Sequence, residues 1–200
     1  STFDALQNHN PELANKIIEK DLAVDALHQE LEERSISIIA RRHPVANDLR
    51  RVIAALKVSA ELERIGDLAK NCAKRAITIA GTPHLPEMIC SLGHMSALAS
   101  SQLNAVLDAF VLRDSARAED VWVSDEKIDS VYNSIFRQLL SYMMEDAKYV
   151  GLCTHLLFIA KNLERIGDHT TNIAETISYM TKATRPSHAR PKGDLTTSIL

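Results

Sequence analysis

Apolar residues recur every three or four positions along most of this chain, and that spacing predicts long amphipathic helices rather than strands. Helices are expected over about 11–41, 44–80 and 86–112, followed by an acidic helix and a last helix. Pro11 suits a first helical turn, and Pro44 separates the first two helices. The stripe expected on the first helix comprises Leu13, Ile17, Val24, Leu27, Leu31 and Ile38. The pattern predicts an all-α fold.

The chain contains an internal duplication, because the pentapeptide ERIGD stands at 63–67 and again at 164–168. An apolar seam follows each copy, made of Leu62, Ile65, Ala69, Cys72 and Ala76 and then of Leu163, Ile166, Thr170, Ile173 and Ile177. A glycine and two prolines mark a linker. We therefore divide the chain into repeat one (1–80), a linker (81–87), repeat two (88–181) and a polar tail (182–200). Repeat one has no counterpart of the helix at 86–112, so it is expected to lack most of its N-terminal helix.

Paired acidic residues accompany both pentapeptides. Glu63 and Asp67 lie four positions apart and share one helical face, as do Asp21 and Asp25 on the preceding helix. Folding the two helices about Pro44 brings Asp25 level with Glu63 and Asp21 level with Asp67. The equivalent acids of repeat two are Asp125, Asp129, Glu164 and Asp168, if its turn lies between residues 146 and 147. Four carboxylates at one level repel one another unless something positive lies between them.

Two interpretations of these acids stay open. The first is a metal site, because oxygen ligands favour iron, manganese, magnesium or calcium, with zinc also considered. The second is a solvated face whose charge Arg64 and Arg165 neutralise. Further candidate ligands are Asn71, Asn172, Glu175 and His28. Glu175 of repeat two corresponds to Lys74 of repeat one, which predicts tighter metal binding in repeat two. His169 points about 100° away from Asp168 and is left out.

Glycine occupies the same position in both pentapeptides, and this repetition also needs a reason. Glycine inside a helix costs about 1 kcal/mol relative to alanine. Gly66 and Gly167 each stand between the two acids of a pair, where a side chain would crowd an approaching helix or partner.

Composition and charge narrow the function classes. The net charge of −3, from 23 basic and 26 acidic residues, argues against a nucleic-acid binder. The three cysteines form no C-x-x-C pair, which fits the cytosol. The longest apolar runs, such as 151–160, are too short to cross a membrane, so any membrane role is expected only through partners. A basic turn with Arg41, Arg42, His43 and Arg50 is a candidate partner contact, although cations also favour a helix C-terminus.

The two ERIGD segments, the paired D-x-x-x-D helices and ARRHPVANDLR at 40–50 resemble the PhoU family of bacterial phosphate-transport regulators over about residues 3–181. The resemblance implies two tandem three-helix bundles and a cytoplasmic, non-enzymatic regulator that represses the phosphate-starvation response when phosphate is plentiful. It also implies a link between the ATPase subunit of the Pst phosphate transporter and a PhoR-type histidine kinase, metal clusters on the eight acids named above, and a homodimer. Two alternatives remain: a ferritin-like di-metal enzyme, whose Glu-x-x-His pairs this chain lacks, and a metal-free structural adaptor.

Overall fold

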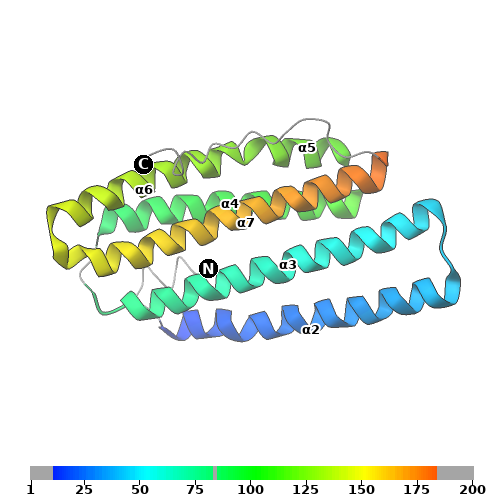
Figure 1. Cartoon of the computed structure of the whole chain (residues 1–200), viewed down its shortest axis with the longest axis horizontal. Coiled ribbons are helices and arrows are strands. Elements are labelled where there is room, and N and C mark those ends of the chain that lie inside the picture. Colours follow the sequence, from blue (N-terminus) through cyan, green and yellow to red (C-terminus); the bar gives the residue numbers. More distant parts are fainter. Residues whose placement is uncertain (1–10, 83–84, 184–200) are drawn as a thin grey trace.

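The fold is a row of long helices placed side by side, seen here in a computed structural model that describes residues 11–82 and 85–183 (Figure 1). All regular structure in these ranges is helical, which confirms the all-α prediction. The elements are α2 (Pro11–Arg42), α3 (Ala46–Ile79), α4 (Pro86–Leu112), α5 (Ser115–Ser124), α6 (Glu126–Glu145), the short 3-10 helix η1 (Ala147–Tyr149) and α7 (Val150–Lys182).

Local sequence explains where these helices begin and end. Pro86 occupies the first turn of α4, where its missing N–H is not needed. The Asp114 carboxylate caps α5 by accepting hydrogen bonds from the backbone N–H groups of Ala116 and Arg117, at 3.0 and 3.1 Å. Asp146 follows α6 and accepts from the backbone N–H of Lys148 at 2.9 Å. The turn of repeat two therefore lies at residues 146 and 147, the position that the predicted pairing of the carboxylates requires.

Repeat two forms a bundle around α7, which packs against α4, α5 and α6. The acidic helix of this repeat is divided at Asp125 into α5 and α6. All five residues of the predicted seam on α7 are buried. The four apolar ones join one large core with Leu92, Met95 and Val106 of α4. By length and composition, α4 is the one helix in the described ranges that could cross a membrane. Its buried side of Leu92, Met95 and Val106 packs against the rest of the bundle instead.

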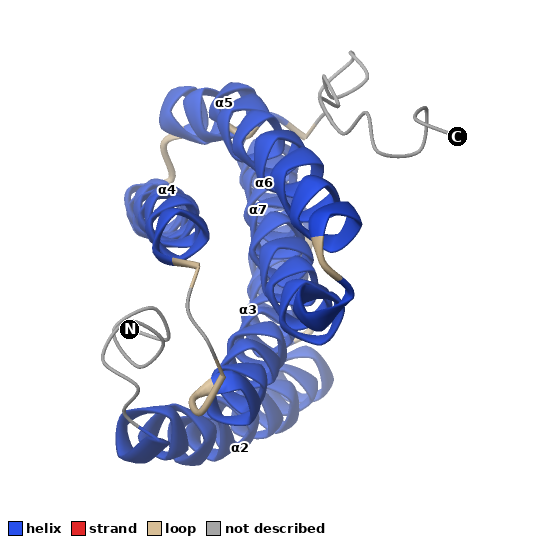
Figure 2. Ribbon diagram, turned by 90° about the vertical axis from the view of Figure 1, so that its left-hand side faces the viewer, coloured by secondary structure: helices blue, strands red, loops and turns tan. Residues whose placement is uncertain are grey.

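Repeat one is the thinner half of the described structure. Helix α2 packs on α3, and α3 in turn packs along α7, so that α2 lies at the far edge from α5 and α6 (Figures 1 and 2). The stripe predicted to be core on α2 is only partly so, because Leu27 is 64% exposed and Ile38 is 41% exposed. Within the described residues α2 packs mainly against α3, so one side of its apolar surface faces outward. Phe3 and Leu6, near the start of the chain, lie outside the described residues.

Candidate functional site

The predicted level is confirmed for one pair of acids in each repeat, Asp21 with Asp67 and Asp125 with Asp168. Asp21 on α2 lies against Gly66 of helix α3. A Cβ atom added to Gly66 would be 2.7 Å from Asp21 Oδ1. Asp125 takes the same position in repeat two, with its Oδ1 2.6 Å from a Cβ built on Gly167. Contacts under 3.0 Å essentially never occur for real Cβ atoms. An alanine at either position would therefore force the approaching carboxylate to move.

Half of these carboxylates lie inside the protein and not on an open acidic face. Four of the eight are buried, at 1–5% exposure: Asp21, Asp125, Asp129 and Glu164. The other four, Asp25, Glu63, Asp67 and Asp168, are partly exposed. The interpretation of these acids as a solvated face is thus wrong for half of them, because the helices that bring the acids level also cover them.

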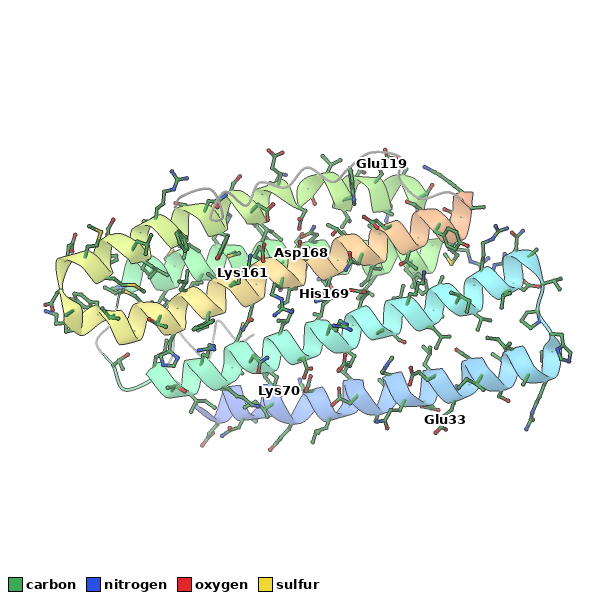
Figure 3. All side chains as sticks on the ribbon, in the orientation of Figure 1. Glu33, Lys70, Glu119, Lys161, Asp168 and His169 are labelled. Atoms are coloured by element: carbon green, nitrogen blue, oxygen red, sulfur yellow. The ribbon has the colours of Figure 1, made fainter. Side chains whose placement is uncertain are left out.

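The cations beside the acids are lysines. Lys70, on α3, donates to Asp21 Oδ2 at 2.5 Å and to Asp67 Oδ1, and these hydrogen bonds raise the pKa of the lysine. Lys161, on α7, donates to Glu164 Oε1 at 2.9 Å (Figure 3 labels both lysines). Arg64 and Arg165, which were expected to neutralise the acids, are exposed. The hydrogen bonds given above pair the buried acids Asp21 and Glu164 with lysines.

A signal for Lys70 was present in the sequence. It stands three positions after Asp67, on the same face of the same helix. Lys161 likewise stands three positions before Glu164. Both lysines could have been found by searching for opposite charges at helical spacing.

Burial makes the charge on Glu164 costly. Desolvation raises the pKa of this carboxyl, and the nearby Asp168 and Asp129 add to that effect, while the hydrogen bond from Lys161 opposes it. The second oxygen of Glu164, Oε2, is buried and has no hydrogen-bond partner within the described ranges. The same holds for Asp21 Oδ1 and Asp25 Oδ1. Buried oxygens without donors are costly and mark places where a cation is favoured.

In repeat two a neighbouring helix supplies a donor to one of the acids. The amide of Gln102 on α4 donates from Nε2 to Asp125 Oδ1 at 3.1 Å and to the carbonyl of Val121 at 3.2 Å. Gln102 is 6% exposed. The sequence analysis missed this residue, since its proximity to Asp125 depends on how α4 packs.

The additional candidate ligands have other partners or face outward. His28 Nδ1 lies 3.0 Å from Ser59 Oγ, and its Nε2 lies 3.7 Å from Glu32. Asn71 is exposed. Asn172 is also exposed and donates to Glu61 of repeat one at 3.1 Å, so the structure does not place it with Asp168. Glu175 is partly exposed.

An ionic contact joins the two repeats beside the clusters. His169 Nδ1, on α7, lies 2.6 Å from Glu61 Oε2, on α3, which confirms that His169 points away from the acids of its own repeat (Figure 3). Burial alone would raise the pKa of Glu61, but the hydrogen bonds from His169 and Asn172 outweigh it and lower the pKa. The contacts of Glu61 with His169 and Asn172 therefore tie α3 to α7.

The basic turn lies at the opposite end of α2 from the chain start. Arg41, Arg42 and His43 are exposed, and Arg50 is partly covered and donates to Asn47 at 2.5 Å. His43 has a φ of 47°, in the left-handed region, where the chain turns from α2 to α3. Two exposed arginines and an exposed histidine at one turn suit contact with an acidic surface.

The donor set suits a hard cation in its chemistry. Each repeat offers four carboxylates. In the two repeats together, three buried carboxylate oxygens have no hydrogen-bond partner in the described part of the chain. Within residues 11–82 and 85–183, no three His, Cys, Asp or Glu side chains already surround a common point as metal ligands would. Holding a cation would therefore require these side chains to turn toward one another.

Comparison with known proteins gives consistent results across the chain. The sequence profile of the PhoU domain matches residues 1–76 and 92–177. A phosphate-specific transport system accessory protein PhoU homolog from Rhizobium meliloti is 46% identical over 195 residues, covering 98% of this chain and 82% of that protein. A homolog of the same name from Caulobacter vibrioides is 44% identical over 191 residues, covering 96% and 83%. The crystal structure of PhoU from Pseudomonas aeruginosa superposes with a TM-score of 0.88 at 33% identity, covering 92% of this chain and 88% of that one.

Proposed function

Because this chain belongs to the PhoU family, we propose that it is an accessory protein of a phosphate-specific transport system that regulates phosphate uptake and the phosphate-starvation response. The observation that carries this proposal is the 46% identity over 98% of the chain to a relative of that name. A non-enzymatic role agrees with the relatives' names, which designate accessory proteins.

The proposed partners are the ATPase subunit of the transporter and a PhoR-type histidine kinase, both met in the cytoplasm. The exposed side chains of Arg41, Arg42 and His43, with Arg50 beside them, support a contact with an acidic partner surface. A homodimer is part of the same proposal, supported by the exposed apolar residues of α2 such as Leu27.

A co-purification experiment tests the partners. The full chain, immobilised, should retain the ATPase subunit and the kinase domain, and the double variant Arg41→Ala/Arg42→Ala should retain less. Arg34→Ala is the matched control, because Arg34 is an exposed arginine of the same helix that pairs with Glu30. A gene deletion should also leave a phosphate-starvation reporter active in high phosphate. Normal repression in the deletion strain would refute the regulatory role.

We also propose that the two carboxylate clusters bind hard metal ions. The ligands would come from Asp21, Asp25, Glu63 and Asp67 in repeat one and from Asp125, Asp129, Glu164 and Asp168 in repeat two. Support comes from their common level on paired helices and from the unpartnered buried oxygens. A bound divalent ion would supply positive charge that stabilises the repeat and could join it to an acidic partner.

Elemental analysis tests the metal proposal. The purified full chain is equilibrated with Mn²⁺, Fe²⁺, Mg²⁺, Ca²⁺ or Zn²⁺ and then dialysed. Retention of at least one ion, reduced in Asp129→Asn, is expected, because Asp129 is buried within the cluster. If the protein retains none of these metals, metal binding by the clusters is refuted, and the protein is a metal-free helical adaptor.

A further inference from the structure

Part of the surface that α3 and α7 share is free of acidic residues. Residues 68–79 of α3 and 150–163 of α7 contain no Asp or Glu, although the whole chain has a net charge of −3. The two helices pack side by side (Figure 1), and Cys72 donates to the Ile159 carbonyl at 3.8 Å, so these two stretches are neighbours. Their cationic side chains are Lys70, Lys74, Arg75 and Lys161. A surface that carries one sign of charge attracts ligands of the opposite sign.

Arg75 of α3 is stacked on the ring of Phe158 of α7. Its guanidinium carbon lies 4.0 Å from the ring centroid. Stacking of this kind holds the guanidinium plane in one orientation and leaves the N–H groups at its edge able to donate. Phe158 is 49% exposed, so the stack can be reached from solvent.

His155 supplies a second donor at the same place. It stands three positions before Phe158 on α7, and its Nδ1 lies 3.4 Å from Arg75 Nη1. A guanidinium only donates hydrogen bonds, so Nδ1 accepts here and the ring hydrogen lies on Nε2. The Nε2–H group is therefore a further donor beside the guanidinium.

Arg75 has no carboxylate partner within residues 11–82 and 85–183, where His155 is the group that accepts a hydrogen bond from it. By contrast, Arg34 and Arg51 each pair with an acid on their own helix. A guanidinium that is held in place and has unused donors is suited to bind the oxygens of a phosphate group in a bidentate manner.

We propose that Arg75, His155 and Phe158 form a binding site for a phosphate group. The guanidinium would donate two parallel hydrogen bonds to two phosphate oxygens, His155 would add a third through Nε2–H, and Phe158 would hold the guanidinium in position. The choice of phosphate among the oxyanions rests on the proposed role in phosphate regulation, whereas the site itself rests on its geometry. The phosphate group comes either from inorganic phosphate or from a phosphoryl group on a larger molecule.

The position of this site gives it a consequence for the whole protein. Arg75 belongs to repeat one, and His155 and Phe158 belong to repeat two. A bound phosphate would therefore add hydrogen bonds across the contact between the repeats. Phosphate concentration would in this way alter how firmly α3 and α7 are held together.

The test is a titration of the full ¹⁵N-labelled chain with inorganic phosphate, followed by NMR at constant ionic strength made up with chloride. The side-chain signals of Arg75 and His155 should shift with one common midpoint. Arg75→Gln should weaken binding by at least about tenfold, because it removes the charge and the paired donors. Lys74→Gln is the matched control, since it removes one positive charge from an exposed neighbouring position, and it should change affinity by less than about twofold.

Two further measurements examine the parts of the site. Phe158→Leu should weaken phosphate binding by about threefold, because the guanidinium loses the ring that orients it. Phenyl phosphate distinguishes the two sources of the phosphate group. Tighter binding of this ester than of inorganic phosphate would assign the site to a phosphoryl group on a larger molecule, and the reverse order would assign it to the free ion.

Urea denaturation checks that each variant is folded. If Arg75→Gln does not fold, Arg75→Lys replaces it, which keeps the charge without the paired donors and should weaken binding by about threefold.

Three results would overturn the site. These are the absence of any phosphate-dependent shift at Arg75, the same shifts with chloride alone, and an equal loss of affinity in Lys74→Gln and Arg75→Gln. None of them bears on the proposed regulatory role, which the reporter in the deletion strain tests separately.

Discussion

Replacing Gly167 by alanine tests the reason for the repeated glycine. Alanine improves helix propensity by about 1 kcal/mol, so propensity alone predicts a more stable protein. The added Cβ, however, would lie 2.6 Å from Asp125 Oδ1 and 3.1 Å from Ile128 Cδ1. Overpacking of this kind costs about 1–3 kcal/mol. Displacing Asp125 also weakens its hydrogen bond from Gln102, worth about 1.5–3 kcal/mol for a charged acceptor.

With the hydrogen bond weakened and not lost, these effects together lower the free energy of unfolding of Gly167→Ala by about 2 kcal/mol. Gly66→Ala should lose less, about 1 kcal/mol, because its second-nearest side chain, Val24, stays at an ordinary 3.7 Å and Asp21 Oδ1 has no hydrogen bond to lose. Gly151→Ala is the matched control, since no atom lies within 4 Å of its added Cβ on the same helix α7. It should be neutral or stabilising by up to about 1 kcal/mol.

Urea denaturation followed by circular dichroism measures these differences, and a thermal scan checks them. For a chain of this size a loss of about 2 kcal/mol lowers the unfolding temperature by roughly 4–8 °C. If Gly167→Ala is as stable as Gly151→Ala, the close approach of Asp125 does not require the glycine, and the explanation for the repeated pentapeptide is wrong.

Three further predictions follow from other parts of the structure. Asp168→Asn should lower bound Mn²⁺ more than Asp67→Asn does, because Lys70 already neutralises Asp67; equal losses by elemental analysis would contradict this. Glu61→Ala should destabilise the protein by about 1–3 kcal/mol in urea, since His169 and Asn172 lose their shared acceptor, and an unchanged midpoint would show that this contact is dispensable. Amide hydrogens of α2 should exchange faster than those of α7, which is enclosed by four helices, and equal protection by mass spectrometry would refute the ranking.

The sequence alone determined the long helices α2, α3 and α4 and, within two residues, their boundaries. Apolar periodicity and the prolines act over a few residues, so the predicted ranges 11–41 and 86–112 agree with α2 (Pro11–Arg42) and α4 (Pro86–Leu112). It also determined which acids come level, because helix length and turn position fix the register of an antiparallel pair. The reason for Gly66 and Gly167 was available from the same register.

Tertiary structure decided which partner each side chain of the site contacts. Lys70 reaches Asp21 across 49 positions of sequence, and His169 reaches Glu61 across 108. Such contacts depend on how each helix is rotated about its axis and on which neighbour covers it. Spacing along the chain fixes neither quantity, so burial of the acids and the donor role of Gln102 became visible only when the helices were packed.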